Sequence, residues 1–224
     1  MALVHSPSIV LNGLISYWDA ANIKSYPGSG TTWSDLSGNR YNGTLTNGPT
    51  YSSGNFGSIS FDGTDDYVLM SSNSFTANGG ATLDIWFNTN TIADDGLLNH
   101  SDFQYFNFFL SNGTTSIRFE YKSTVSNFTQ LFSTTNSIVV GNWYNVVGVV
   151  DSVGAKIYIN GTLNASNTTP QNLGTVTSNV YVGAYNATEY RYSGKISVVK
   201  RYNRPLSAAE VSQNFNAIRG RYGV

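Results

Sequence analysis

The chain has 224 residues, a formal net charge of −1 and 11% charged residues, so it carries no electrostatic footprint for binding nucleic acid. It contains no cysteine, which excludes disulfides and thiolate metal sites, and no apolar run approaches the roughly 18 residues that a membrane-spanning helix needs. The 40% hydrophobic residues are enough to fill the core of one domain, and membrane insertion is not expected.

Residues 1–12 are predicted to lie apart from the main domain. They lack a basic start, and Pro7 and Asn12 interrupt any apolar stretch, so no secretory signal is expected. Their large apolar side chains need a surface to bury against, and the candidates for anchoring the chain to another protein are Leu3, Val4, Ile9 and Val10. The segment is therefore either an anchoring arm or an edge segment that folds back on a domain of residues 13–224.

Turn signals recur through the middle of the chain at short intervals. They are Asn-Gly and similar pairs at residues 42–43, 47–49, 78–80, 112–113 and 160–161. Between them apolar and polar residues alternate, as in Phe106, Phe108 and Leu110, with the period of a half-buried strand. Many short strands in a chain of this length predict one all-β sandwich. Trp86 and Trp143 fall on such patterns and are assigned to the core.

The C-terminal third carries the most specific patterns. Residues 141–151 contain an apolar run bounded by Gly141 and Asp151, which predicts a strand buried on both faces. Residues 156–161 alternate and end in an Asn-Gly turn, which predicts a hairpin. Residues 194–199 predict a further strand, which leads toward a helix.

One helix is predicted, beginning after Pro205. Ser207 is the expected N-cap, and Glu210 lies three residues later, as a capping box requires. An apolar stripe suited to packing on a sheet consists of Val211, Phe215 and Ile218. Gly220 is placed to end the helix.

The order of these motifs resembles the concanavalin A-like lectin/glucanase superfamily, in its laminin G-like branch. The matching segments are residues 58–68, 81–87, 141–151, 156–161 and 194–211. The resemblance implies an antiparallel jelly-roll β-sandwich with one short C-terminal helix. Residues 26–39 and 214–223 resemble a version of the module found in bacteriophage structural proteins. Because this fold hosts enzymes, lectins and structural modules alike, the resemblance specifies the fold more than the ligand.

No catalytic residues are predicted. Retaining glucanases of this superfamily resemble one another in a strand that holds two glutamates around an aspartate, with the carboxyls about 5–5.5 Å apart. Glutamate occurs here only at Glu120, Glu189 and Glu210, which are far apart in sequence. Glu210 is already assigned to the helix cap. The chain is therefore not expected to be an enzyme.

Calcium is the metal that the sequence leaves open. Asp62, Asp65 and Asp66 offer hard oxygen ligands on one turn, and residues 94–95 offer a second acidic pair. Similar laminin G-like proteins hold Ca²⁺ at the rim of the sandwich. The alternative is that these carboxylates cap their own turns through Asx hydrogen bonds.

An aromatic loop provides the candidate ligand site. Tyr185, Tyr190, Arg191 and Tyr192 lie close together between two predicted strands, and Trp33 lies in the Gly- and Ser-rich N-terminal region. Sugar rings stack on aromatic side chains while polar neighbours bind the hydroxyls, so these residues are candidates for binding a glycan. Alternatively, they fill a satellite core or line a subunit contact.

The function expected from these observations is that of a non-enzymatic bacteriophage surface protein. Capsid decoration comes first and a head or tail fibre second, with virion proteins, further copies of the chain and a cell-surface glycan as partners. A chain without an export signal would then leave its host by lysis, on the virion. The alternative is a free carbohydrate-binding lectin or adhesion module outside the cell, and the third option is a glycan hydrolase.

Overall fold

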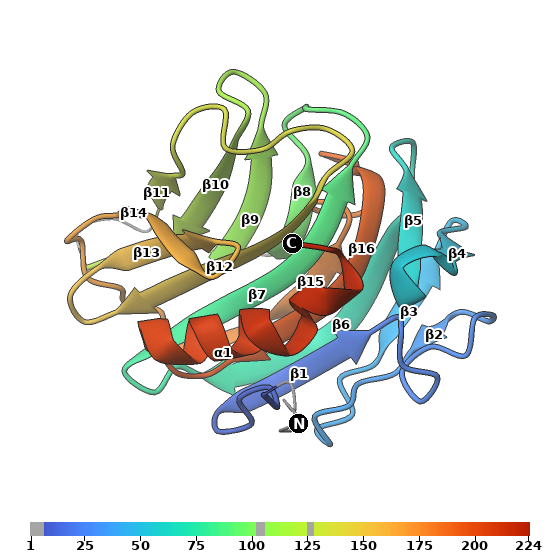
Figure 1. Ribbon diagram of the computed structural model, residues 1–224. Helices are drawn as coiled ribbons and strands as arrows, with labels where there is room; N and C mark the ends of the chain where they lie inside the picture. Colours follow the sequence, from blue (N-terminus) through green and yellow to red (C-terminus); the bar gives the residue numbers. More distant parts are fainter. Residues whose placement is uncertain (1–6, 102–105, 125–127) are drawn as a thin grey trace, which may run out of the picture.

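A computed structural model describes residues 7–101, 106–124 and 128–224, and in this part of the chain the strands form two antiparallel sheets that face each other (Figure 1). The first sheet contains β1 (Leu14–Asp19), β4 (Thr50–Ser52), β5 (Ser58–Asp62), β7 (Gly80–Thr89), β12 (Trp143–Asp151), β13 (Ala155–Ile159), β14 (Thr162–Ser166) and β16 (Ser193–Tyr202). Its order is β14-β13-β12-β7-β16-β5-β4, and β1 also pairs with β16.

The second sheet contains β2 (Thr32–Trp33), β3 (Gly43–Thr46), β6 (Tyr67–Thr76), β8 (Gly96–His100), β9 (Phe106–Ser111), β10 (Ser116–Tyr121), β11 (Thr129–Phe132) and β15 (Thr175–Val182). Its order is β11-β10-β9-β8-β15-β6-β3-β2. The remaining elements are helix α1 (Ala208–Ile218) and the 3₁₀ turns η1 (Gly54–Phe56) and η2 (Arg219–Arg221). The predicted all-β sandwich with one C-terminal helix is therefore confirmed.

The main core lies between the two sheets and follows the alternation of the strands. Phe108 on β9 and Phe119 on β10 point inward and are fully buried. They reach across to Gly148 on β12, where a Cβ atom would lie 2.7 Å from the Phe108 ring and 2.8 Å from the Phe119 ring. The glycine in the apolar run 143–151 is thus needed for the close approach of the opposite sheet.

Helix α1 lies on the outer face of the first sheet, across β7 and β12 (Figure 1). Trp86 on β7 stacks on Phe215 of the helix with the ring centroids 5.7 Å apart, and on Tyr222 with the centroids 4.4 Å apart. Trp143 packs in the same cluster. Both tryptophans belong to the core, as predicted, but they fill a second layer beneath the helix rather than the space between the sheets.

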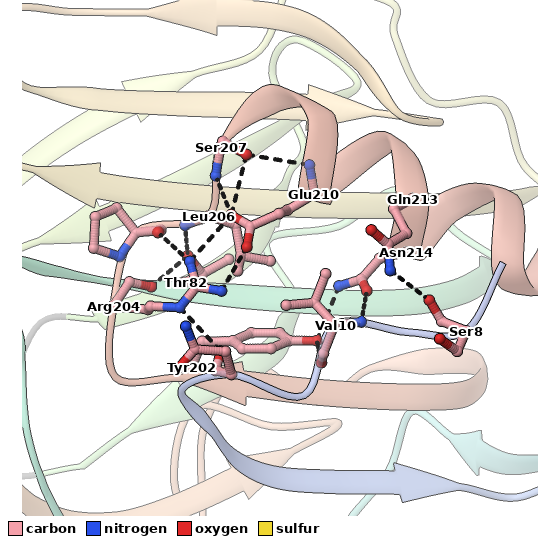
Figure 2. Close-up of polar contacts among 12 residues, drawn as sticks. Ser8, Val10, Thr82, Tyr202, Arg204, Leu206, Ser207, Glu210, Gln213 and Asn214 are labelled. Atoms are coloured by element: carbon pink, nitrogen blue, oxygen red, sulfur yellow. Dashed lines mark hydrogen bonds and ion pairs between the residues drawn. The ribbon is translucent and has the colours of Figure 1, made fainter.

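The predicted capping box is present at the start of α1. The Ser207 side chain accepts a hydrogen bond from the Glu210 backbone N–H, and the Glu210 carboxylate accepts one from the Ser207 backbone N–H (Figure 2). Arg204 also binds Glu210, with Nη2 2.6 Å from Oε1. Gly220 does not end the helix as predicted, because the chain continues from Ile218 into the 3₁₀ turn η2.

Residues 8–10 fold back beneath α1 (Figure 2). The Val10 N–H donates to Asn214 Oδ1 at 2.8 Å, and its carbonyl accepts from the Tyr202 hydroxyl at 3.0 Å. Val10 is buried, and Ile9 packs against the cluster around Trp86. The expectation that Ile9 and Val10 anchor the chain to another protein is therefore wrong, because Val10 is buried in this domain and Ile9 is partly buried against it.

The other two proposed anchoring residues, Leu3 and Val4, lie outside the described residues. The described part of the segment folds back on the domain, but it does so as an irregular stretch and not as an edge strand. No helix among the described residues is long and apolar enough to cross a membrane.

Candidate functional site

A hollow of about 290 Å³ lies on the outer face of the second sheet, where the chain 183–192 approaches β9 and β10. Its lining consists of Phe109, Arg118, Glu120, Phe128, Tyr185 and Tyr190. Alternation along the strands explains this set: Phe108 and Phe119 face the core, so their neighbours Phe109, Arg118 and Glu120 face outward. Phe109 and Arg118 are direct partners across the β9–β10 pair.

One wall of the hollow is a cluster of three aromatic rings. The ring centroids of Phe109 and Tyr185 are 5.6 Å apart, and Tyr190 lies 5.8 Å from each of them at nearly right angles. Tyr190 is 46% exposed, so part of its side chain is open to solvent. Such mutually packed rings are held in place, which lowers the entropy lost when a ligand stacks on them.

The backbone at Tyr190 is strained. Its φ is +53°, a left-handed conformation that is uncommon for a bulky residue and costs of the order of 1–3 kcal/mol. Two hydrogen bonds maintain it: the Gly96 N–H donates to the Tyr190 carbonyl at 2.9 Å, and the Tyr185 N–H donates to the Glu189 carbonyl at 3.1 Å. The loop thus holds the Tyr190 ring over the sheet at a cost in backbone energy, as is often found where a residue has a functional role.

The floor of the hollow is a charged pair on β10. Arg118 Nε lies 3.1 Å from Glu120 Oε1, an ion-pair distance whose angles do not make a hydrogen bond. The Arg118 guanidinium is stacked 4.3 Å from the centroid of the Phe109 ring. Glu120 also accepts hydrogen bonds from Gln130 at 3.1 Å and from Asn107 at 3.5 Å. The site therefore combines fixed hydrogen-bonding groups with an aromatic wall.

The structure brings together only part of the predicted ligand site. Tyr185 and Tyr190 line the hollow. Trp33 does not, because it is fully buried and stacks on Trp18 with the centroids 5.8 Å apart. Tyr192 is also fully buried, and its hydroxyl donates to the Asn88 carbonyl at 2.7 Å. These two residues belong to the core, so their assignment to a ligand site is wrong.

Arg191, the remaining predicted residue, is directed elsewhere. Its guanidinium lies 5.2 Å from the centroid of the Tyr67 ring and donates to the Ala187 carbonyl. The lining residues that sequence reasoning missed are Phe109, Arg118, Glu120 and Phe128. Their alternation with buried residues marks Phe109, Arg118 and Glu120 as outward-facing, but only the fold places the tyrosine loop beside them.

The carboxylates do not form the catalytic pair of a retaining glucanase on β10. Arg118, not an acidic residue, occupies the same face of the strand two residues before Glu120. Glu189 is exposed and accepts a hydrogen bond from Asn186 at 2.8 Å. Glu210 is held by Arg204 at the helix cap, and the hydrogen bond from Arg204 lowers the pKa of Glu210 to about 2.

The acidic turn after β5 fits both a metal site and a turn capped by its own carboxylates. Oxygen atoms of Asp62, Asp65 and Asp66 lie within 4.8 Å of one another, a spacing that suits a hard cation. The same carboxylates cap the turn: Asp62 accepts from the Thr64 N–H at 2.7 Å, and Asp66 accepts from the Asp62 N–H at 3.0 Å. Burial raises the pKa of Asp66, and the neighbouring carboxylates add to this effect.

Asp94 and Asp95, the second acidic pair, lie in different environments. Asp94 is exposed, accepts from the Asn112 N–H at 3.2 Å and lies 4.0 Å from Arg118. Asp95 is buried beside β8, and burial together with Asp94 raises the pKa of Asp95 to about 6.

Comparison with known families agrees with this architecture. A family model described as the concanavalin A-like lectin/glucanases superfamily matches residues 62–212, more than half of the chain. The chain belongs to this superfamily. None of the curated proteins matches the sequence of this lectin/glucanase-superfamily domain.

Solved structures with the same fold include binding domains of toxins. The binding domain of Paraclostridial Mosquitocidal Protein 1 is 18% identical with a TM-score of 0.70, and it aligns with 92% of this domain over 52% of its own length. The ligand-binding domain of botulinum neurotoxin serotype D, solved with N-acetylneuraminic acid, is 14% identical with a TM-score of 0.67, covering 92% of this domain and 51% of its own length. The domain thus spans about half the length of these toxin domains.

A third structure aligns over nearly its whole length. Domain 4 of AbnA, a GH43 extracellular arabinanase from Geobacillus stearothermophilus, was solved with arabinotriose. It is 17% identical with a TM-score of 0.66, covering 90% of this domain and 97% of its own chain. At these identities the similarity establishes the shared fold.

Proposed function

We propose that this domain binds a glycan without hydrolysing it, and that the hollow over β9 and β10 is the binding site. The observation that carries the proposal is the combination, in one hollow, of an aromatic wall in which Tyr190 is exposed with the fixed Arg118–Glu120 pair. A pyranose or furanose ring can stack its C–H face on Tyr190 while its hydroxyls bind the guanidinium and the carboxylate.

Two further observations support a binding function. Similar solved structures contain N-acetylneuraminic acid in one case and arabinotriose in another, so sugar ligands accompany this fold. Retaining hydrolysis needs two carboxyl groups, but Glu120 is the one carboxylate on β10, and Arg118 lies two residues before it on the same face of the strand. A cation there pairs with Glu120 and leaves that strand without the acid–nucleophile pair.

The experiment that tests the site is a glycan array followed by calorimetric titration of the best ligand. Tyr190→Ala should weaken binding at least about tenfold, because the stacking surface is lost. Phe56→Ala is the matched control, since Phe56 is also an exposed aromatic with a positive φ, and it lies outside the hollow. Equal affinities for wild-type protein and Tyr190→Ala would show that the ligand does not use this hollow.

Hydrolysis is tested separately, by assaying release of reducing sugar from the glycan that binds. We expect no release above that of heat-inactivated protein. Release that Glu120→Gln abolishes would show that the domain is a hydrolase and would refute the non-enzymatic part of the proposal.

We also propose that the domain is displayed on a bacteriophage particle, as a capsid decoration protein or a fibre component. The observation that favours this location is the resemblance of residues 26–39 and 214–223 to segments of phage structural proteins. Ile9 and Val10 give it no support, because both pack against the domain itself. Mass spectrometry of purified particles should detect the protein in stoichiometric amount. Its absence from particles would leave the free lectin or adhesion module outside the cell.

A further inference from the structure

Carboxylates outnumber cationic side chains around the hollow. Arg118 is the one cationic side chain among its described lining residues. It faces two carboxylates, with Glu120 Oε1 at 3.1 Å from Nε and Asp94 Oδ1 at 4.0 Å from Nη1. The guanidinium is therefore more than neutralised by its own neighbours, and the local field in the hollow favours a ligand without negative charge.

Arg118 is also unable to turn toward an anionic ligand at low cost. Its guanidinium is held between the Phe109 ring and Glu120, and its side chain is only 17% exposed. Moving it away would leave Glu120, whose side chain is 6% exposed, without its cation. Burying a carboxylate without a partner is costly, so the ion pair resists exchange with the carboxylate of a ligand.

The same pair remains well suited to neutral hydroxyls. A guanidinium has more N–H donors than one carboxylate contact occupies, and a carboxylate accepts from several donors. Arg118 can thus donate to one sugar hydroxyl while Glu120 accepts from the next. Gln130 and Asn107 hydrogen-bond Glu120 from neighbouring strands and fix its position, and Arg118 is held by Glu120 and the Phe109 ring.

The nearby cations outside the lining do not reverse this balance. Arg191 keeps its charge but does not line the hollow, because its guanidinium lies against the Tyr67 ring and donates to the Ala187 carbonyl. Lys122 lies two residues after Glu120 and does not line the hollow. The exposed Glu189 adds a further negative charge beside Tyr190. We infer that the hollow selects neutral, hydroxyl-rich glycans and rejects those that carry carboxylate, sulfate or phosphate groups. This inference rests on the proposed function and specifies its ligand class.

The experiment compares matched pairs of oligosaccharides on the full chain. Each pair has the same backbone, with and without a terminal sialic or uronic acid, and dissociation constants are measured by calorimetry at about 50 mM and about 500 mM salt. The neutral member should bind at least about tenfold more tightly at low salt, and the difference should shrink at high salt because repulsion is screened. Acidic members that bind as tightly as neutral ones would overturn the inference. Failure of every glycan to bind would instead refute the proposed function.

Two charge variants locate the origin of the selectivity. Glu120→Gln removes the carboxylate charge and frees Arg118, so the ratio of acidic to neutral dissociation constants should fall at least about fivefold. Asp65→Asn changes the net charge of the protein by the same amount at an exposed residue outside the lining, and should leave that ratio unchanged. Equal effects of the two variants would show that the overall charge, and not the Arg118–Glu120 pair, sets the preference.

Discussion

Lys200 and Asp84 form an ion pair that is sealed from solvent beneath helix α1. Lys200 Nζ lies 2.7 Å from Asp84 Oδ2, and both side chains are fully buried. The Asn145 and Asn214 amides donate to the two oxygens of Asp84, at 2.8 Å and 3.1 Å. The carboxylate is thus surrounded by donors, so its stability in the core depends on keeping all of them.

Removing the cation alone should be strongly destabilising. We expect Lys200→Met to lower the free energy of unfolding by about 3–5 kcal/mol, because it leaves an uncompensated buried carboxylate. The double variant Lys200→Met/Asp84→Asn should recover a large part of that loss, since the charge is then gone. Urea unfolding of both variants is the measurement, and a single variant as stable as the wild type would contradict this account.

Asp95 makes stability depend on pH between about 4 and 6. Burial raises its pKa to about 6 in the folded protein, above the ordinary value of 3.8. The folded state therefore binds this proton more tightly than the unfolded chain does, so the resulting stabilisation is present below about pH 4 and is lost as the pH rises through 6.

Asp95→Asn mimics the protonated side chain and should stabilise the protein at pH 7.5. The expected gain is about 1–3 kcal/mol at pH 7.5 and close to zero at pH 4, where wild-type Asp95 is itself protonated. Thermal unfolding at the two pH values measures both. An equal effect at pH 4 and pH 7.5 would show that the change acts through packing and not through the charge.

At the scale of elements, the N-terminal segment and helix α1 stabilise each other. Val10 bonds to Asn214 through its N–H and to Tyr202 through its carbonyl, and the Gln213 amide donates to the Ser8 carbonyl at 2.7 Å. Asn214 in turn donates to Asp84 on β7. The segment therefore completes the polar layer between the helix and the first sheet.

Deleting residues 1–10 should consequently destabilise the domain instead of merely releasing it from a partner. We expect a loss of about 2–4 kcal/mol from the exposed apolar surface and the unpaired Asn214 and Tyr202 groups. Deletion of residues 1–6 alone is the control, because it keeps the hydrogen bonds that Ser8 and Val10 make with Gln213, Asn214 and Tyr202. A 1–10 deletion that melts like the full chain would show that these contacts contribute little.

At the scale of the whole molecule, the acidic turn joins the two sheets. Asp62 ends β5 in the first sheet, and Asp65 and Asp66 directly precede β6 in the second. A cation held by these three carboxylates would bridge the sheets and would bind only the folded state. Calcium should then stabilise the protein by RT ln(1 + [Ca²⁺]/Kd), or about 2.7 kcal/mol at a hundredfold excess over Kd.

We accordingly expect millimolar Ca²⁺ to raise the Tm of protein first treated with EDTA, and Asp65→Asn to reduce that rise. Asp62 and Asp66 cap the turn by accepting from backbone N–H groups, so Asp65→Asn tests metal binding without removing either cap. A Tm that does not change on addition of Ca²⁺ would show that the carboxylates act only as turn caps.

Much of the fold could be predicted from local patterns. The capping box at Ser207 depends on residues three positions apart, and the strand at residues 143–151 depends on consecutive apolar residues, so both are visible in the sequence. The sequence marks residues 185–192 as an aromatic loop, but it does not show which of these side chains are exposed and which are buried. Tyr190 and Tyr192 are two positions apart, yet one is 46% exposed and the other is fully buried.

The sequence by itself determined the strand pattern, the single capped helix and membership of the superfamily, because these follow from spacing along the chain. Only the tertiary structure decided which side chains meet. Residues 185–190 lie beside Arg118 and Glu120 only in the folded chain. Val10 likewise packs beneath a helix that lies about 200 residues later in the sequence. Such contacts form when the two sheets and their loops pack together. They join residues that are far apart in sequence, so no local pattern along the chain predicts them.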